Sequence, residues 1–310
     1  MSDLISTIKK VLGETDLVLG WRRDGSTGVA TPARFYNEEE AEAAIFDATC
    51  CHNLAVHLPR LKDKNVGIVA KGCDVMGIVE LIVEREVERE KVRVIGVSCP
   101  GMVDVKTIWR QHGYGVTIED DGTTLTVAGK QLDRNENLQR KCVGCRDSLP
   151  VIVDEKVGGE ITASPTAALK REMNELEARF AAMSPDERGA FWDEQFERCI
   201  RCYACREACP MCYCRDVCTM QTQEPHWTRG ETYSKENEMA QFIRVNHLAG
   251  RCTGCGECER ACPVGIPLML YLDEQNRVIE ELFDYRAGTD LDAKPPLLTF
   301  SIESDAWGES

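Results

Sequence analysis

The pattern of apolar and polar residues in the first half of the chain predicts an α/β arrangement. Apolar residues at helical spacing predict a helix over Leu4–Leu12, and a short apolar run predicts a strand over Leu17–Trp21. Asn37 is predicted to start a helix, because the three glutamates that follow it suit the positive end of a helix dipole. A further helix is expected over Asn53–Leu61.

The clearest unit in this half is a parallel crossover. The apolar run Asn65–Ala70 predicts a buried strand, and a glycine turn then leads into a helix that is expected to end at about Glu88. Val92–Val97 predicts the next strand, and a strand–helix–strand unit of this kind pairs its two strands in parallel. The alternating segment Tyr114–Lys130 predicts a hairpin around its Asp-Gly pair.

The chain is predicted to divide into four parts. Residues 1–165 form the α/β domain, and residues 166–198 form a charged, alanine-rich linker of two helices, in which Pro185 suits a first helical position. Residues 199–290 form a cysteine-rich domain, for which we expect an α+β fold. Residues 291–310 form an extended tail.

Composition and charge narrow the range of functions. The formal net charge is −15 and the isoelectric point is about 4.9, so nucleic acid and anionic membranes are poor partners. The start of the chain has acidic residues and no long apolar run, and the apolar stretches are too short to cross a bilayer. We therefore expect a cytoplasmic protein without a membrane span.

Cysteine is the unusual component of this composition. The chain has 17 cysteines, an odd count, and disulfides are rare in a reducing compartment. Thiol catalysis would use one or two of them. Metal ligation is the remaining common explanation.

One cysteine motif occurs twice. Both copies have the spacing C-x2-C-x2-C-x3-C-P, which holds [4Fe–4S] clusters in two-cluster ferredoxins, where the last cysteine of each motif serves the other cluster. One cluster is therefore assigned to Cys199, Cys202, Cys205 and Cys262, and the other to Cys252, Cys255, Cys258 and Cys209. A pair of structural zinc sites is the rival, but it would use separated cysteine pairs.

Other residues near the motifs leave alternatives open. Three cysteines between the motifs either ligate a further cluster or are thiols near the existing ones: Cys212, Cys214 and Cys218. Four arginines beside the motifs either offset cluster charge or are ordinary solvated charges: Arg198, Arg201, Arg251 and Arg260.

A second group of cysteines lies in the α/β domain. Cys73 and Cys99 follow two neighbouring parallel strands, whose carboxyl ends share one sheet edge, and Cys142 and Cys145 form a two-ligand hook. These four make a four-thiolate site, or else two core cysteines and a separate zinc or redox pair. Cys50 and Cys51 compete for the same roles.

The glycine turn that contains Cys73 has a second possible use. It opens a helix, and a helix N-terminus after a glycine turn is a natural anion site. The turn could therefore hold the phosphate of a flavin or deazaflavin.

At this point the chain resembles the beta subunits of coenzyme F420-reducing hydrogenases and of F420- or ferredoxin-linked formate dehydrogenases. The resemblance covers nearly the whole chain, and its second half is similar to the form with a fused dicluster ferredoxin domain. It is carried by the segments Cys50–Leu61, Val69–Asp74, Ile95–Asp104, Lys141–Gly158, Arg198–Pro210 and His247–Met269.

The resemblance implies a flavin domain with one FAD and one proximal [4Fe–4S] cluster, and thus three clusters in the chain. It places the proximal cluster on Cys73, Cys99, Cys142 and Cys145. It places flavin contacts near Asn53, Lys71, Gly72, Asp74 and Gly101.

The function that follows is electron transfer in an anaerobic oxidoreductase complex. FAD would exchange two electrons, as a hydride, with coenzyme F420 or another carrier, and the clusters would pass single electrons. The expected partners are a catalytic dehydrogenase or hydrogenase subunit, heterodisulfide-reductase-like subunits, or both. The alternative is a flavin-free wiring subunit that carries only iron–sulfur clusters.

Overall fold

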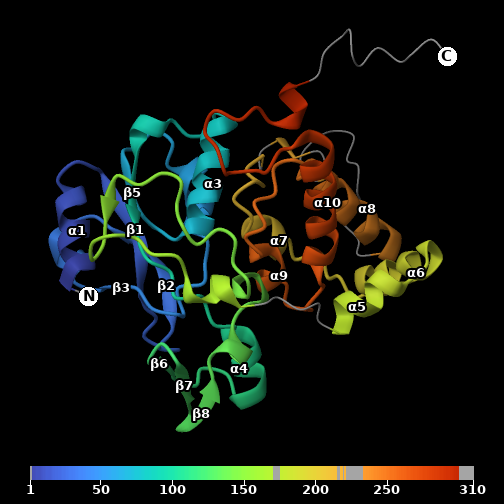
Figure 1. Ribbon diagram of the computed structural model, residues 1–310, viewed down its shortest axis with the longest axis horizontal. Coiled ribbons are helices and arrows are strands. Elements are labelled where there is room, and N and C mark those ends of the chain that lie inside the picture. The colour runs from blue at the N-terminus through green and yellow to red at the C-terminus, as the bar shows by residue number, and fades with distance from the viewer. Residues whose placement is uncertain (1, 170–174, 215–216, 219, 221–232, 300–310) are drawn as a thin grey trace. The chain divides into compact units, whose positions relative to one another are not determined.

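The computed structural model describes residues 2–169, 175–214, 217–218, 220 and 233–299. It divides into two compact units, Met1–Arg171 and Glu172–Ser310. Each unit is described by itself (Figure 1).

A mixed sheet forms the centre of the N-terminal unit. Its strand order is β2-β1-β4-β5-β9, with β3 also paired to β1. The strands β1, β4, β5 and β9 run parallel, whereas β2 and β3 are antiparallel to β1. The bounds are β1 Leu17–Arg23, β2 Ala30–Phe35, β3 Ala44–Ile45, β4 Val66–Ala70, β5 Val92–Gly96 and β9 Glu155–Lys156.

The predicted parallel crossover is confirmed. The helix α3, Gly72–Val83, connects β4 to β5, and the two strands pair in register from Val66 opposite Val92. Every residue of β4 is buried, as its unbroken apolar run predicted. The crossover therefore places the start of α3 and the end of β5 at one edge of the sheet.

Two of the expected helices differ in extent or type. The helix α1, Ser2–Leu12, forms as expected, and so does the helix start at Asn37, which caps the single turn α2, Glu38–Ala41. The segment η1, Leu54–Arg60, is a 3₁₀ helix that contains a proline. The helix α3 ends at Val83 rather than near Glu88, because Arg85 has a left-handed backbone with φ 61°.

This unit also contains a second, smaller antiparallel sheet, which is separate from the main one (Figure 1). The predicted hairpin is confirmed, since β6, Ile118–Asp120, pairs with β7, Thr124–Val127, and β8, Lys130–Asp133, adds a third strand. The helix α4, Val105–His112, contributes Ile108 to the apolar cluster that this sheet covers.

The described part of the C-terminal unit consists of helices and loops. Its longer helices are α5 Glu175–Ala182, α6 Pro185–Glu197, α8 Ser234–His247 and α10 Leu268–Phe283. Two short helices lie within the cysteine motifs, α7 Ala204–Glu207 and α9 Glu257–Ala261, and they pack together. Pro185 stands at the first turn of α6, after a capping box between Ser184 and Glu187.

The expectation of an α+β fold for residues 199–290 is not met in their described part, where no strand is found. The segments next to the motifs carry their apolar residues at helical spacing. Phe191, Phe196, Leu268 and Leu272 are buried on helices, and α6 packs against α8.

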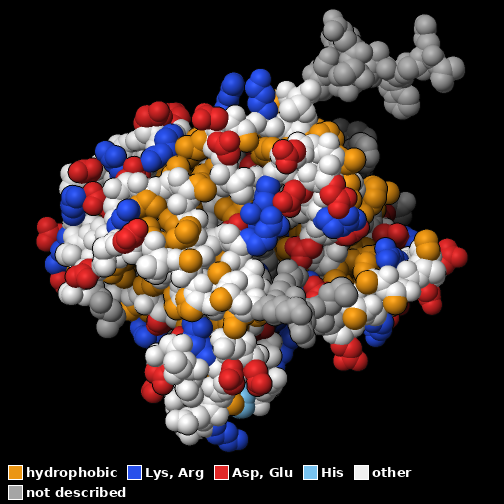
Figure 2. Space-filling view, viewed as in Figure 1, with side chains coloured by type: hydrophobic (Ala, Val, Ile, Leu, Met, Phe, Trp, Pro, Cys, Tyr) orange, Lys and Arg blue, Asp and Glu red, His pale blue; other side chains and the backbone are white. Residues whose placement is uncertain are grey.

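The surface mixes both signs of charge. Lys and Arg side chains are interspersed with Asp and Glu over the face shown in Figure 2. Within the described residues, no helix has both the length and the apolar character that a membrane crossing requires.

Candidate functional site

The two copies of the cysteine motif share one backbone conformation. In the first copy Arg201 and Tyr203 have φ of 47° and 59°, and in the second copy Gly254 and Gly256 have φ of 70° and 68°. These residues lie between successive cysteines, so the left-handed turns alternate with the thiols. Non-glycine residues rarely adopt this conformation, so the first loop keeps it at some cost.

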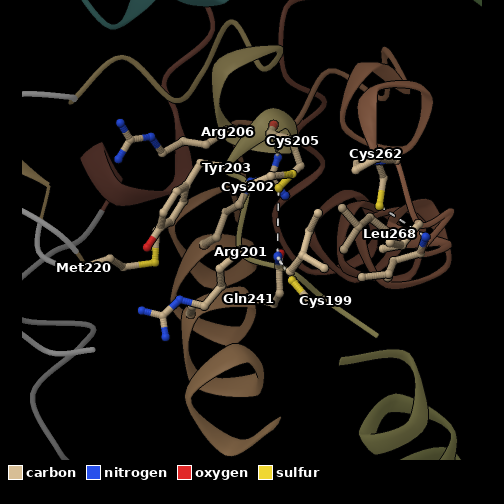
Figure 3. A pocket seen from close by; sticks show the side chains of 16 residues that line it. Cys199, Arg201, Cys202, Tyr203, Cys205, Arg206, Met220, Gln241, Cys262 and Leu268 are labelled. Atoms are coloured by element: carbon tan, nitrogen blue, oxygen red, sulfur yellow. Dashed lines mark hydrogen bonds between the residues drawn. The ribbon is translucent and has the colours of Figure 1, made fainter. Parts of the chain in front are cut away.

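The first cysteine set lines one pocket. Cys199, Cys202 and Cys205 reach it from the first motif, and Cys262 reaches it from the second. Figure 3 shows these thiols together with Gln241, which projects from α8. The crossed arrangement expected from the spacing is therefore present in the geometry of this set.

The second cysteine set is also brought together across the two motifs. The pKa of Cys252 is raised to about 12, mainly by burial and in addition by the neighbouring sulfurs of Cys255 and Cys209. Burial likewise raises the pKa of Cys258, to which the same neighbours contribute. Cys209, from the first motif, thus lies among the three cysteines of the second.

Of the remaining cysteines of this unit, Cys212 lies beside Cys209 of the second set. A hydrogen bond with Cys209 lowers the pKa of Cys212. Burial raises the pKa of Cys214, and the nearby Cys218 raises it too. Cys218 is buried in an apolar cluster with Met220 and Ile243, which suits a core thiol.

Sequence reasoning did not identify the polar face of α8. Asn237, Gln241 and Arg244 are spaced four and three residues apart, so they share one face of this helix, and all three are buried. Gln241 Nε2 lies 3.9 Å from Sγ of both Cys199 and Cys205. The signal in the sequence was a set of polar residues at helical spacing between the two motifs.

The arginines beside the motifs mostly have other partners. Arg260 forms an ion pair of 2.7 Å with Glu257, and Arg251 donates to the carbonyl oxygens of His247 and Met211. Arg198 donates to Gln195 Oε1 at 2.8 Å. Arg201 is largely buried and lines the first pocket.

The N-terminal cysteines gather at the sheet edge that the crossover created. Cys73 lies in the first turn of α3, and Cys99 follows β5. The pKa of Cys99 is raised to about 11, mainly by burial, and Cys142 is one of the neighbours that contribute to the rise. Burial also raises the pKa of Cys145, with Cys142 again beside it.

Close backbone packing holds the Cys142–Cys145 hook against α3. A Cβ atom built on Gly72 would stand 1.9 Å from the carbonyl oxygen of Asp147, so the loop after the hook lies directly on the start of the helix. The segment before the hook is also fixed, because Gln139 N–H donates to the carbonyl oxygen of Met102 at 2.8 Å.

Cys50 and Cys51 are buried in the same unit. Burial raises the pKa of Cys50 far above its usual range, and Asp47 N–H donates to its sulfur at 3.4 Å. Cys51 Sγ lies 3.9 Å from His52 Nδ1.

Four of the five expected flavin-contact residues lie around the start of α3: Asn53, Lys71, Gly72 and Asp74. Lys71 Nζ lies 2.8 Å from Asp74 Oδ2 and 4.2 Å from the centre of the Trp21 ring. Asn53 Nδ2 donates to the carbonyl oxygen of Cys73, next to Gly72. Burial raises the pKa of Asp74, and Lys71 opposes that rise.

Gly101 lies apart from these four residues, in the turn after β5. Its φ is 87°, and its carbonyl oxygen accepts a hydrogen bond of 2.8 Å from the buried Arg134. Arg134 in turn pairs with Asp120 of the small sheet. The small sheet therefore supports the turn that carries Cys99.

The donor sets fit iron–sulfur clusters better than a single metal ion. In the described parts of the chain, no group of His, Cys, Asp or Glu is close enough for one ion to bind. A cube spreads its four thiolates over four irons, so its ligands stand further apart. Backbone N–H groups already donate to the sulfurs, from Ile266 to Cys262 at 3.3 Å and from Met102 to Cys142 at 3.4 Å.

Comparison with known proteins identifies relatives of both units. The family of 4Fe–4S dicluster domains matches residues 194–266. The F420-dependent formate dehydrogenase subunit beta of Methanocaldococcus jannaschii is 26% identical over 302 residues, which cover 78% of each chain. The F420-dependent formate dehydrogenase 1 subunit beta of Methanococcus maripaludis is 24% identical over 299 residues, which cover 76% of each chain.

Among solved structures, the F420-reducing [NiFe] hydrogenase complex of Methanosarcina barkeri matches with a TM-score of 0.38 and 15% identity, covering 50% of this chain and 61% of that one. A likeness at this level carries no further conclusion. The motifs, the length of the match to the two formate dehydrogenase subunits and the dicluster domain agree: the chain is similar to F420-dependent formate dehydrogenase beta subunits over most of its length and carries a 4Fe–4S dicluster domain.

Proposed function

We propose that the chain is the electron-transfer subunit of an F420-linked formate dehydrogenase or hydrogenase complex, with one FAD and three [4Fe–4S] clusters. The relatives named for F420-dependent formate dehydrogenase favour formate as the electron source of the complex. The partner is then a catalytic formate dehydrogenase subunit.

One observation carries this proposal: the two cysteine sets of the C-terminal unit are exchanged between the motifs. Cys262 lines the pocket of the first motif, and Cys209 lies beside Cys252 and Cys258 of the second. Each cubane needs a fourth thiolate from outside its own loop, and this exchange supplies it. Cysteines exchanged in this way would hold two neighbouring clusters, between which electrons can pass.

The N-terminal set supports a third cluster near the flavin. Cys73, Cys99, Cys142 and Cys145 come from the ends of two parallel strands and from one hook, and their sulfurs lie close enough to affect one another's pKa. Such a strand edge is where α/β proteins bind cofactors.

Two buried polar atoms support the flavin itself. Asp74 Oδ1 and Trp21 Nε1 are buried and have no hydrogen-bond partner among the described residues. Both side chains lie against Lys71. A flavin ring carries both hydrogen-bond donors and acceptors, which are the two kinds of partner that Asp74 Oδ1 and Trp21 Nε1 lack.

FAD, when bound, exchanges two electrons with a hydride carrier and single electrons with a cluster. In this chain Lys71 would hold a positive charge beside the ring, because Asp74 keeps its ammonium group charged. Asn53 ties η1 to the start of α3 through the carbonyl oxygen of Cys73, which keeps the flavin residues and a cluster ligand in one frame. Each set includes at least one buried cysteine, among them Cys142, Cys199 and Cys255, whereas Cys202 of the first set is exposed.

The first experiment is anaerobic purification followed by measurement of iron, acid-labile sulfide and flavin per chain. About twelve irons and one FAD are expected for three cubanes and a flavin. About eight irons without flavin would contradict the flavin-based function and would leave the two-cluster wiring subunit. Zinc in place of iron would contradict the cluster assignment altogether.

Two variants test the cysteine assignment. Cys255→Ser should remove about four irons from the C-terminal unit, and Cys142→Ser should remove the proximal cluster's signal while the ferredoxin signals remain. Cys50→Ser is the matched control, because Cys50 is buried outside the proposed set and should not change the iron count. Full iron in Cys255→Ser would refute the assignment.

A further inference from the structure

The polar face of α8 runs past both cysteine sets. Asn237 Nδ2 donates to the carbonyl oxygens of Phe196 and Cys199, at 3.1 and 2.7 Å, and this fixes the first motif to the helix. One turn further, Gln241 donates to two sulfurs of the first set, as Figure 3 shows. Arg244 is the last residue of this face.

Arg244 is a buried cation between the two cysteine sets. Its side chain lines the pocket of the first set, and its Nη2 donates to the carbonyl oxygen of Cys205 at 3.1 Å. Burial alone would lower the pKa of Arg244, but the sulfurs of Cys258, Cys212, Cys205 and Cys209 together raise it well above its ordinary value. Cys205 belongs to the first set, and Cys258 and Cys209 belong to the second.

The hydrogen-bonding capacity of Arg244 is only partly used. Its Nε and Nη1 are buried and have no partner among the described residues. Only 3% of this residue is exposed, and the described residues place no carboxylate in an ion pair with it. A buried guanidinium without a counter-ion is costly, so it needs anionic acceptors from a bound group.

A thiolate-ligated cluster is such a group. Each [4Fe–4S] centre with four thiolates is anionic in its ordinary states and becomes more negative by one charge on reduction. A fixed positive charge and hydrogen bonds to cluster sulfur stabilise the reduced form and raise the reduction potential. The effect is large where solvent screening is weak, as it is for a buried side chain.

We propose that Arg244 is the residue that sets the potentials of both C-terminal clusters, while Gln241 acts on the first cluster alone. This proposal rests on the proposed cluster assignment. The difference between the two residues follows from their positions. Gln241 touches sulfurs of the first set only, whereas Arg244 contacts Cys205 of the first set and is near enough to Cys258 and Cys209 of the second set to interact with them electrostatically. The shared cation keeps the two potentials close together, which suits electron exchange between the clusters.

Other arginines of this unit are poorer candidates. Arg260 is neutralised by Glu257, and Arg277 on α10 pairs with Glu274 and Glu281. Arg251 donates to two backbone carbonyls and covers the ring of Tyr213. Arg244 combines burial, unused donors and proximity to both sets.

The test is a redox titration of the full-length, cluster-loaded protein, followed by electron paramagnetic resonance. R244Q should lower the reduction potentials of both clusters. At a fixed applied potential, the ratio of reduced to oxidised cluster should fall about tenfold for each, which corresponds to about 59 mV for a one-electron step. R244K keeps the charge and should restore most of the potential. R277Q makes the same charge change at an exposed position and should leave both steps in place.

The outcomes separate this proposal from the cluster assignment. Wild-type protein without iron would refute the assignment itself. If R244Q keeps its full iron content and both reduction potentials are unchanged, the role of Arg244 is overturned and the cluster assignment stands. Loss of iron from both R244Q and R244K would also overturn it, because the guanidinium would then be a structural group.

Gln241 keeps the proposal testable if R244Q retains too little iron. Q241L removes the amide that donates to Cys199 and Cys205. It should therefore lower the reduction potential of the first cluster and leave that of the second unchanged. A shift of both steps, or of neither, would contradict the division of roles between Gln241 and Arg244.

Discussion

Single residues decide whether the cysteines of each set can meet. Gly254 and Gly256 let the second motif turn back between its thiols, and Arg201 and Tyr203 adopt the same left-handed conformation in the first motif without the freedom of glycine. In the N-terminal unit the decisive residue is Gly72, whose missing side chain allows the loop of Asp147 to lie on the start of α3.

Gly72→Ala should therefore damage the N-terminal site selectively. The new Cβ would meet backbone atoms of Asp147 and Ser148, which cannot rotate away, so the loop that carries the Cys142–Cys145 hook must move. We expect a loss of about 1 to 3 kcal/mol in the free energy of unfolding of this unit and loss of about four irons. Iron analysis and chemical denaturation measure the two effects.

Gly25→Ala is the matched control in the same unit. A Cβ on Gly25 meets nothing within 4 Å, so this variant should keep its iron and its stability. Equal damage in both variants would show that close packing at Gly72 is not what positions the hook.

At the scale of elements, α8 links the end of α6 to the first cysteine motif. The link depends on Asn237, which is 1% exposed and donates to the carbonyl oxygens of Phe196 and Cys199. These carbonyls lie where α6 ends and the motif begins, so the helix holds the first thiol in place through the backbone.

Asn237→Ala should release this link. Two buried carbonyl oxygens would lose their donor, which costs about 2 to 3 kcal/mol, and the first cluster should bind iron more weakly. Asn246→Ala on the same helix removes an exposed side chain that donates only to Phe242, and it should change stability by less than about 1 kcal/mol. Thermal melting and the iron retained after gel filtration would compare them; similar values would contradict the role of Asn237.

On the scale of the whole molecule, the two units have different kinds of core. The N-terminal unit buries aliphatic residues on a sheet, with every residue of β4 buried. The C-terminal unit buries cysteines and methionines among its helices, including Cys255, Cys258, Cys262 and Met211. Thiols that ligate clusters make the stability of such a unit depend on iron.

Removal of iron by a chelator should therefore affect the two units differently. Hydrogen exchange should accelerate at the amides around both motifs, residues 199–262, while the amides of β4 and β5 remain protected. Mass spectrometry of exchanged peptides makes the comparison within one sample. Uniform acceleration in both units would mean that the sheet also depends on the clusters.

Much of the local structure could be predicted from the sequence because it depends on neighbouring residues. The unbroken apolar run of β4, the helix start at Pro185 and the Asp-Gly turn of the hairpin are local signals, and each has the expected structure. Two helices differed from the prediction. The segment Leu54–Arg60, which contains Pro59, is a 3₁₀ helix, and α3 is shorter than expected because Arg85 has a left-handed backbone.

The sequence by itself determined the cluster type, because the spacing of each motif limits which thiols one loop can present to one cube. The tertiary structure decided what lies around those thiols. Gln241 and Arg244 lie beside the cysteine sets because α8 packs against α6 next to the first motif, and Asp147 lies on Gly72 because a distant loop folds onto α3. Such contacts join residues far apart in the chain, and the sequence pattern near any one of them does not encode its partner.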